Sequence, residues 1–292
     1  MVEQVKIAVI GGSGLYNIPE LTDISRHSID TPFGKPSGDI VIGTLRGKRV
    51  AFLPRHGEGH TIAPAFIPQR ANIYALKTLG VRFCIAVNAC GSLREDFAPG
   101  HIAIPDQLFD YTIGTRERSF FTTGVVAHVS VADSFDDYLR KVLVTAVEQT
   151  GETVHDGGNF LIEDGPRFAT KSESHIFRQW GCDLIGMTSA PEAFLAREAE
   201  IAYAAMAHIT DYDSWHVSEA PVTSDAVRAT FETNIVIVRK ALAHTIENLQ
   251  QDTVNTSHTA LDAALGSNPD YIPDEKLEEL HPILARVLKL NS

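Results

Sequence analysis

The apolar residues of this chain form two kinds of pattern that alternate along it. Short, almost continuous apolar runs predict buried strands. They lie at residues 5–10, 40–45, 49–53, 82–87, 101–104, 160–162, 184–187 and 201–209. Apolar residues at helical spacing predict helices at 71–79, 134–149, 172–180, 191–199 and 224–249. Strands that alternate with helices predict an α/β/α architecture.

The C-terminal part of the sequence has a different pattern. Residues 250–273 are polar and contain Asn, Thr, Ser and Pro, which predicts a linker. Residues 274–290 return to apolar positions at helical spacing, so we expect a last amphipathic helix there. The sequence therefore predicts one domain over 1–249, a linker, and a C-terminal helix over 274–292 that packs on the domain or on a neighbouring subunit.

Composition narrows the classes of function. The chain has 292 residues, with 25 Lys and Arg against 37 Asp and Glu, a formal charge of −12. Nucleic acids and anionic membranes are bound chiefly through many cations, so we exclude both as partners. No run approaches 18 apolar residues and the N-terminus has no signal-peptide pattern. Three cysteines, an odd number, fit a reducing compartment, and we expect a cytoplasmic protein.

Three polar segments follow predicted strands directly. They are 11–14, 88–92 and 210–213. In open α/β sheets, ligands bind beyond the carboxyl ends of the strands. We therefore expect these segments to meet along one edge of the sheet, although they are far apart in the sequence.

The first segment, Gly11-Gly12-Ser13-Gly14, suits an anion because glycines let backbone N–H groups approach it and Ser13 adds a hydroxyl. Taken alone, a tight turn explains it equally well. A nicotinamide-dependent oxidoreductase would use this loop for its dinucleotide, but Asn17 occupies the third glycine position of that fingerprint.

Arg55 and His56 follow another predicted strand and offer a planar cation beside a second donor, which suits an oxyanion such as phosphate. A surface arginine beside a turn histidine is the plainer interpretation of the motif alone. His56 and His60 have the spacing of a zinc-binding helix, but Gly57 stands where H-E-x-x-H needs glutamate. We therefore expect no metal site.

Asp211 and Asp213 come directly after the most apolar strand of the sequence. Two carboxylates at a buried strand end are costly unless they are protonated, paired or used. A carboxyl group can give a proton to a ring nitrogen, and a second can accept from an exocyclic amine. The alternative is a pair of solvated aspartates in a turn.

Eight segments, in this order, resemble a known family. They are IGGSGL (10–15), DTPFGKPS (30–37), RHGEGH (55–60), ANIYALK (71–77), NACGSLRE (88–95), GPRF (165–168), GMTSAPEAFLAREA (186–199) and TDYDSW (210–215). The chain resembles the methylthioadenosine-cleaving members of the trimeric purine nucleoside phosphorylase family over roughly residues 5–249. The resemblance implies a single-domain α/β/α fold with a mixed sheet, and a homotrimer or hexamer.

The resemblance also implies an activity. Inorganic phosphate, as co-substrate, would cleave 5′-methylthioadenosine to adenine and 5-methylthioribose 1-phosphate, without a metal or an organic cofactor. A broader phosphorylase acting on adenosine or 6-oxopurine nucleosides is the first alternative. A nucleoside-binding module without catalysis is another.

Site residues follow from matching positions in the resemblance. Phosphate would be bound by Ser13, Arg55, His56, Asn88, the backbone N–H of Ala89, and Thr188. The nucleoside would contact Cys90, Gly91, Phe168, Met187, Asp211, Asp213, Val227, and His128 of a neighbouring subunit. Asp211 would act on N7 of the purine and Asp213 on its 6-amino group. Because an aspartate accepts from an amino group, the pair favours adenine over 6-oxopurines.

This sequence departs from the family at several positions. Ser13 and Asn88 stand where many members have threonine, and Ala169 where a serine often contacts the base. Asp164 is an extra residue before the GPRF run, which makes the loop geometry there hard to predict. Ser224 and Arg228 occupy positions that are apolar in some relatives, so the fit of a methylthio group depends on whether Arg228 points outward.

Overall fold

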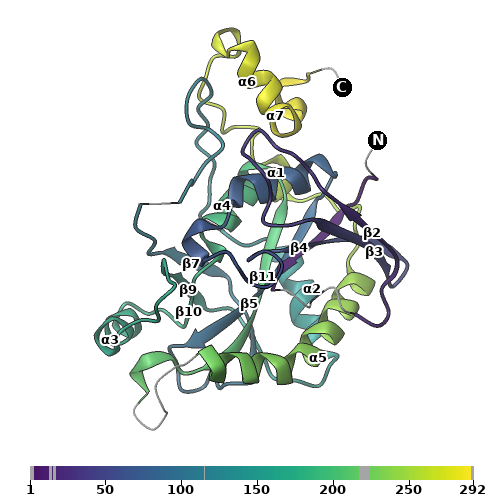
Figure 1. The fold of residues 1–292 in the computed structure, drawn as a ribbon. Coiled ribbons are helices and arrows are strands. Elements are labelled where there is room, and N and C mark those ends of the chain that lie inside the picture. The colour runs from purple at the N-terminus through teal and green to yellow at the C-terminus, as the bar shows by residue number, and fades with distance from the viewer. Residues whose placement is uncertain (1–2, 13–14, 16–17, 115, 217–223, 291–292) are drawn as a thin grey trace.

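An 11-stranded mixed sheet forms the centre of the computed structural model, and helices cover both of its faces (Figure 1). The structure describes residues 3–12, 15, 18–114, 116–216 and 224–290, and of residues 224–234 the backbone alone. This architecture is the α/β/α fold with a mixed sheet that the sequence and the family resemblance predict.

The strands are β1 (Ile7–Gly11), β2 (Thr22–His27), β3 (Ile40–Leu45), β4 (Lys48–Pro54), β5 (Phe83–Ser92), β6 (Ile102–Ile104), β7 (Gln107–Asp110), β8 (Val154–Asp156), β9 (Asn159–Ile162), β10 (Leu184–Gly186) and β11 (Ala202–Asp211). Their order in the sheet is β2-β3-β4-β1-β5-β10-β9-β7, and β11 pairs with β5 and leads to β6 and β8. The long parallel pair of β5 and β11 is therefore the central axis of the sheet.

The helices are α1 (Gln69–Thr78), α2 (Asp137–Glu148), α3 (Lys171–Gln179), α4 (Ser189–Glu198), α5 (Ser224–Asn248), α6 (Asp274–Glu279) and α7 (His281–Leu288), with short 3₁₀ turns η1 (Pro64–Phe66), η2 (Asp213–Trp215), η3 (Thr256–Thr259) and η4 (Pro269–Tyr271). Side chains of α1, α4 and α7 share one hydrophobic core, and those of α2 and α5 share another. These two cores are the layers on either side of the sheet.

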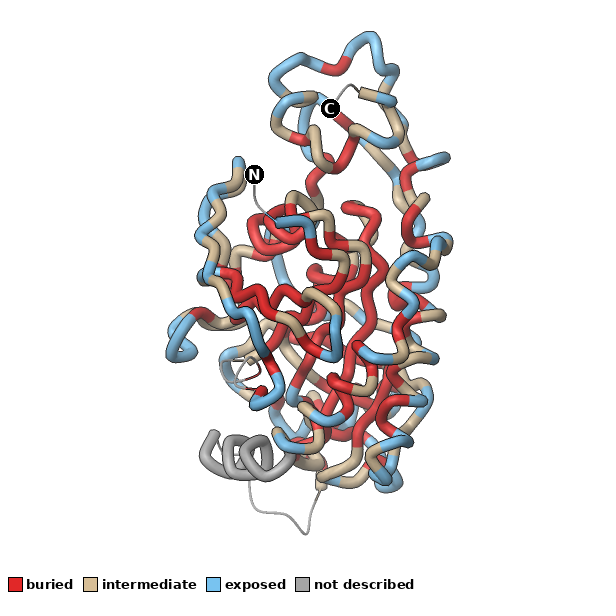
Figure 2. The backbone as a smooth tube through the Cα atoms, turned by 90° about the vertical axis from the view of Figure 1, so that its right-hand side faces the viewer, coloured by how far each residue is buried: buried red, intermediate tan, exposed pale blue. Residues whose placement is uncertain are grey.

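Alternation along β1 shows how the sequence builds both layers. Ile7 and Val9 lie in the core beneath α2 and α5, whereas Ala8 and Ile10 lie in the core beneath α1 and α4. A strand covered on both faces needs apolar residues at every position, which explains its continuous apolar run. Figure 2 shows the consequence as buried chain through the middle of the molecule.

Strand β5 is longer than the sequence predicts. The expected strand ended at Val87, and 88–92 were expected to form a loop. In the structure β11 pairs with β5 as far as Gly91, and β10 pairs antiparallel with Gly91 and Ser92. These partners keep the backbone extended to Ser92, so Asn88 and Cys90 are strand residues.

The C-terminal segment also differs from the prediction. Residues 250–273, the predicted linker, contain η3 and η4 and bury Ser257, His258 and Leu261 against the domain. The predicted last helix is two helices, α6 and α7, separated at Leu280. Leu280, Ile283 and Leu284 are fully buried in the core that contains α1, so the segment packs on its own domain.

Within the described part of the chain, no helix combines the length and the apolar composition that a bilayer span requires.

Candidate active site

The predicted convergence of strand ends is confirmed. Strand β1 pairs in parallel with β4 and with β5, and β5 pairs in parallel with β11. The carboxyl ends of these four strands therefore face the same edge of the sheet. The Arg55 backbone N–H donates to the Gly11 carbonyl at 2.9 Å, which places the residue after β4 beside the end of β1.

A gap in the strand pairing of β5 defines the place of the site. On one side of β5, pairing with β1 stops at Ala86, and pairing with β10 begins at Gly91. Between them, residues 87–90 have no described strand as neighbour on that side. Asn88 lies within the gap and Gly91 at its end; they are three residues apart in extended chain, so about 10 Å separates them.

Arg55 lies at the first end of this gap and is 2% exposed. Its Nε and Nη2 donate to the two carboxylate oxygens of Glu192 at 2.9 and 2.8 Å. Nη1 donates to the Val87 carbonyl at 2.8 Å, and the Tyr203 hydroxyl donates to Glu192 at 2.8 Å. Burial disfavours the charge, but the Glu192 carboxylate outweighs it and raises the pKa of Arg55.

The pairing changes the electrostatics of the predicted anion site. Arg55 is neutralised by Glu192, so an anion in the gap meets an oriented ion pair and not an isolated cation. Sequence reasoning missed Glu192. The available signal was one glutamate within the apolar run SAPEAFLA of α4, at a position that is fully buried.

His56, the next predicted phosphate ligand, is half-buried. Its Nδ1 lies 2.9 Å from the Ile62 carbonyl, and its ring stacks on His60 with centroids 4.1 Å apart. Burial lowers the pKa of His56 to about 4, so the ring is neutral at physiological pH. A carbonyl only accepts, so the proton is on Nδ1 and Nε2 is left as an acceptor. That nitrogen suits the O–H group of a hydrogen phosphate.

Asn88 and Thr188 meet across the gap. The Asn88 Nδ2 donates to the Thr188 Oγ1 at 2.9 Å, which leaves the Thr188 hydroxyl hydrogen free to point elsewhere. The Asn88 Oδ1 is buried, and no donor among the described residues bonds to it. An unpaired buried oxygen is costly, which points to a ligand donor such as a ribose hydroxyl. Gln69 supports this corner by donating to the Thr188 carbonyl at 3.1 Å.

Asp211 and Asp213 lie at the other end of the gap. Asp213 is 6% exposed and Asp211 is half-buried, so neither is a freely solvated turn residue. A Cβ atom on Gly91 would lie 3.1 Å from Asp211 Oδ1 and 3.1 Å from Asp213 Cβ. Glycine at this position of β5 therefore leaves room for both carboxylates.

Hydrogen bonds fix the Asp211 carboxyl group. Its Oδ1 accepts from the Asp213 backbone N–H at 2.8 Å, and its Oδ2 lies 2.7 Å from the Thr210 Oγ1. The Thr210 hydroxyl also lies 3.1 Å from the Cys90 carbonyl, which can only accept. When the single hydroxyl hydrogen points at Cys90, Asp211 must donate. This arrangement accommodates a protonated Asp211, and burial raises its pKa.

Asp213 is held by α3, and the charge of a third carboxyl group that sequence reasoning missed, Glu163, interacts with it. The Ser174 hydroxyl donates to Asp213 Oδ2, and burial raises the pKa of Asp213 to about 6. Burial, together with the charge of Asp213, raises the pKa of Glu163 to about 7. At the base end of the gap, burial thus raises the pKa of the carboxyl groups and favours their protonated forms.

The other residues predicted to contact the ligands differ in burial and in what holds them in place. Met187 lies against Gly165, where a Cβ atom would come within 2.5 Å of its sulfur. Phe168 is half-exposed on the following loop, which the Ser214 hydroxyl ties down by donating to the Ala169 carbonyl at 2.7 Å. The Cys90 thiol is buried, and burial raises its pKa well above the ordinary value. Ala89 belongs to β5 and is exposed.

His128 lies in a different part of the molecule. Its backbone N–H donates to the Ala264 carbonyl at 2.8 Å, and Ala127 forms an isolated bridge with Leu265. The segment after β7 runs to the C-terminal helices, away from α3 and β10 (Figure 1). Ser13 lies outside the described residues, as do the side chains of Val227, Ser224 and Arg228.

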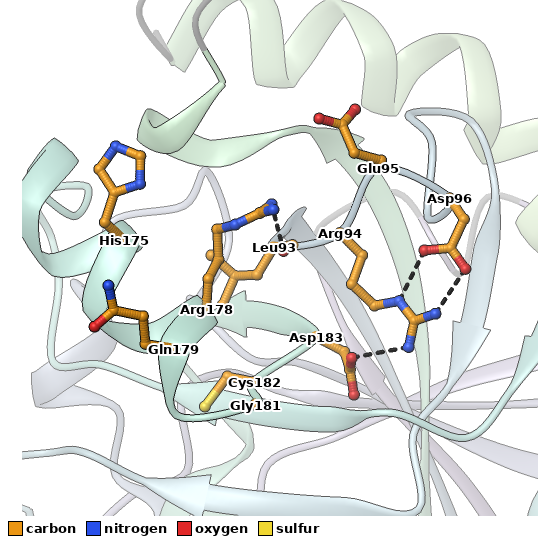
Figure 3. Close-up of a pocket in the computed structure, with 10 residues that line it drawn as sticks. All are labelled: Leu93, Arg94, Glu95, Asp96, His175, Arg178, Gln179, Gly181, Cys182 and Asp183. Carbon is orange, nitrogen blue, oxygen red and sulfur yellow. Dashed lines mark hydrogen bonds and ion pairs between the residues drawn. The ribbon is translucent and has the colours of Figure 1, made fainter.

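An open hollow of about 550 Å³ lies beside α3, outside the gap (Figure 3). Its charged side chains are paired: Arg94 bonds Asp96 and Asp183, and Arg178 donates to the Leu93 carbonyl at 2.7 Å. Among the described residues, no group of three or more His, Cys, Asp or Glu side chains is arranged to hold a metal ion.

Known proteins are similar to this chain over nearly its full length. A family model described as the phosphorylase superfamily matches residues 6–249. The S-methyl-5′-thioadenosine phosphorylase of Chloroflexus aurantiacus is 49% identical over 96% of this chain and 97% of its own length. The crystal structure of a methylthioadenosine phosphorylase from an Antarctic soil metagenomic library has a TM-score of 0.93 and 41% identity, covering 97% of this chain and 100% of its own. The methylthioadenosine phosphorylase from Schistosoma mansoni, in complex with adenine, has a TM-score of 0.83 and 35% identity, covering 89% and 97%.

Proposed function

The chain belongs to the phosphorylase superfamily, and we propose that it cleaves 5′-methylthioadenosine with inorganic phosphate, giving adenine and 5-methylthioribose 1-phosphate. One observation supports this most directly. The gap along β5 has anion-binding groups at Asn88 and acidic groups at Gly91, about 10 Å apart, which is the span of a ribose with its base.

The acidic end suits a departing adenine. As a phosphate oxygen bonds to the anomeric carbon, the bond from that carbon to N9 breaks and its electron pair moves into the purine. Asp211 gives a proton to N7, which neutralises the developing charge. Asp213 accepts from the 6-amino group. Burial keeps a proton available on this carboxylate cluster, because it raises the pKa of Asp211 and Asp213.

The other end suits a hydrogen phosphate. The Thr188 hydroxyl and the remaining Arg55 N–H donate to its oxygens, and His56 Nε2 accepts from its O–H. Because Glu192 neutralises Arg55, directed hydrogen bonds contribute more to binding here than net positive charge. The net charge of −12 is therefore compatible with one small anion, although it argues against polyanions.

The catalytic unit in this proposal is a cytoplasmic trimer. His128 is placed by the C-terminal segment of its own chain, as the contact with Ala264 shows, and in a trimer it would reach the 5′ end of a neighbour's substrate. We also propose that no metal or organic cofactor takes part, so chelation with EDTA should leave turnover unchanged.

The decisive experiment measures adenine release from 5′-methylthioadenosine with and without inorganic phosphate. Release that requires phosphate supports the proposal, whereas release that ignores phosphate would identify a hydrolase. Comparing kcat/KM for methylthioadenosine, adenosine and inosine then tests the role of the carboxylates. Inosine as the best substrate would contradict the assignment of Asp211 and Asp213.

A further inference from the structure

Arg116 is a buried arginine outside the predicted set of site residues, and it is 8% exposed. Its Nη1 donates to the carbonyls of Met187 at 2.8 Å and Ala190 at 2.6 Å. Its Nη2 donates to the carbonyls of Glu163 at 3.2 Å and Asp164 at 3.0 Å. The Nε faces the Asp164 carboxylate at 3.4 Å. Four of the five N–H groups of this guanidinium thus donate to carbonyls of two loops, and the Nε contributes the ion pair with Asp164 but no hydrogen bond among the described residues.

These two loops hold opposite ends of the candidate site. Strands β9 and β10 lie side by side in parallel and end together, with Ile162 opposite Gly186. The chain leaving β9 leads to Phe168, beside the base end. The chain leaving β10 contains Thr188, at the phosphate end. Beyond the two strand ends, Arg116 bonds to both chains.

Asp164, the extra residue of this sequence, is part of the same arrangement. Its Oδ2 accepts from the Ile113 backbone N–H at 2.8 Å, while its Oδ1 and its carbonyl face Arg116. The added carboxylate thus anchors the segment that contains Arg116 and supplies the counter-charge for it.

A lysine could not replace this arginine. Four carbonyls accept from the two terminal nitrogens of the guanidinium fork, whereas an ammonium group has three donors at one point. Burial opposes the charge and lowers the pKa of Arg116, so the position is costly without its partners. Such a cost suggests a role beyond filling space.

We propose that Arg116 is a positioning residue that couples two loops, so that phosphate binding strengthens adenine binding. They are the base loop, residues 165–169 after β9, and the phosphate loop, residues 187–190 after β10. This inference rests on the proposed function. Phosphate bonded to Thr188 orders the chain from Met187 to Ala190, and Arg116 transmits that order to the carbonyls that precede the base loop. Binding of either ligand then lowers the entropic cost of ordering the two loops when the other ligand binds.

The test measures the dissociation constant of adenine by calorimetry, with and without saturating inorganic phosphate. For the wild-type enzyme we expect phosphate to tighten adenine binding at least about 5-fold, the lower end of typical coupling. In Arg116→Lys the factor should fall below about 2-fold, and in Asp164→Asn it should be intermediate. Arg118→Ala is the matched control, because Arg118 lies in the same segment but, among the described residues, bonds to Asp110 and Thr112 and to neither loop.

Two results would overturn the inference: no coupling in the wild-type protein, or full coupling in a folded Arg116→Lys variant. If Arg116→Lys fails to fold, Asp164→Asn decides, and an unchanged coupling factor in that variant also contradicts the role. Phosphorolysis by the wild-type enzyme is measured alongside. Absence of phosphorolysis by the wild type would refute the proposed function. Normal turnover by the wild type, together with an unchanged coupling factor in the variants, would refute the role of Arg116 alone.

Discussion

At the scale of single residues, chemistry in this site depends on how each charge is held. Asp211 has its carboxylate oxygens fixed by the Asp213 backbone and by Thr210, so its free lone pairs have a defined direction. Arg55 has most of its donors occupied by Glu192 and Val87. Proton transfer is thus assigned to one end of the gap along β5, and anion binding to the other.

Replacing Asp211 with asparagine removes the proton donor with little change in shape. We expect kcat for methylthioadenosine to fall by roughly 10²–10⁴, the typical loss for a general acid. Steady-state kinetics on the purified variant would check this, with adenine binding measured as a control for site integrity. Turnover near the wild-type value would rule out proton donation by Asp211.

Replacing Glu192 with glutamine leaves a buried cation without its counter-charge. Breaking one partner of a buried ion pair typically costs about 3–5 kcal/mol, so the melting temperature should drop. Phosphate can then act as the missing anion, and it should raise the melting temperature of Glu192→Gln by more than that of the wild type. Thermal melts with and without phosphate measure this, and equal phosphate shifts would contradict it.

Stability should also depend on pH through Glu163. Its pKa is raised to about 7 in the folded protein from the ordinary value of 4.5. The stabilisation from its protonated form is complete below pH 4.5 and is lost as pH rises through 7. Between pH 5.5 and 8 this group should lower the free energy of unfolding of the wild type by about 2 kcal/mol, and Glu163→Gln should lack that decrease. Urea unfolding at pH 5.5 and at pH 8 measures this, with the exposed Glu148→Gln as control. If the free energy of unfolding changes equally with pH in both variants, the prediction is contradicted.

At the scale of elements, the sequence was a good guide to strands and a poor guide to side-chain partners. The apolar runs predicted β1, β5 and β11, and the rule of strand ends predicted that segments 11–14, 88–92 and 210–213 would meet. Glu192 and Arg116 were not predictable, because their partners depend on how α4 and the loops pack. Arg55 and Glu192 are 137 positions apart, and nothing in either local sequence indicates the pairing.

The extent of β5 was missed for a related reason. Polar residues at 88–92 interrupt the apolar run, and local propensity predicts a loop there. Pairing with β11 and β10 overrides that propensity. The gap of the site exists because this polar stretch stays in the sheet. The wrong prediction of a loop therefore concerns the candidate functional residues themselves.

Helix α3 links fold stability to the base end of the site. Thr170 and Glu173 form a capping box at its N-terminus, and Ser174 in its first turn donates to Asp213. Thr170→Ala should cost about 1 kcal/mol of stability and raise the KM for nucleoside more than the KM for phosphate. Denaturant unfolding and two-substrate kinetics check both effects.

The control for that variant is Asn268→Ala, which removes the cap of η4 in the C-terminal segment. It should leave both KM values near those of the wild type. A Thr170→Ala enzyme with both KM values unchanged would show that α3 does not position Asp213.

At the scale of the whole molecule, the C-terminal segment, residues 250–290, packs against the domain and holds other segments in place; we call it the C-terminal brace. The polar sequence of 250–273 did not predict this packing. Glu200 is buried at the end of α4 and pairs with Arg286 of α7, and the Ser257 hydroxyl donates to Asp136 at 2.6 Å. The segment also holds residues 126–128, since Gly266 N–H donates to the Val126 carbonyl at 2.8 Å. The brace therefore fixes the position of His128, whose backbone N–H donates to the Ala264 carbonyl and whose ring lies near Gly266.

The proposed trimer with a shared site can be tested by mixing two inactive variants. If each site combines Asp211 of one subunit with His128 of the next, Asp211→Asn and His128→Ala homotrimers are each impaired in every site. After unfolding and refolding as an equal mixture, every mixed trimer contains one site with both natural residues, so about a quarter of wild-type turnover should return.

Each variant refolded alone provides the baseline, and the recovered activity should follow the mixing ratio with a maximum near equal proportions. A site built within one subunit cannot regain both residues by exchange. Activity of the mixture that equals the average of the two separately refolded variants would therefore show that His128 serves its own chain or none. Recovery above that average, in contrast, requires that His128 of one subunit completes the site of another, as the proposed trimer demands.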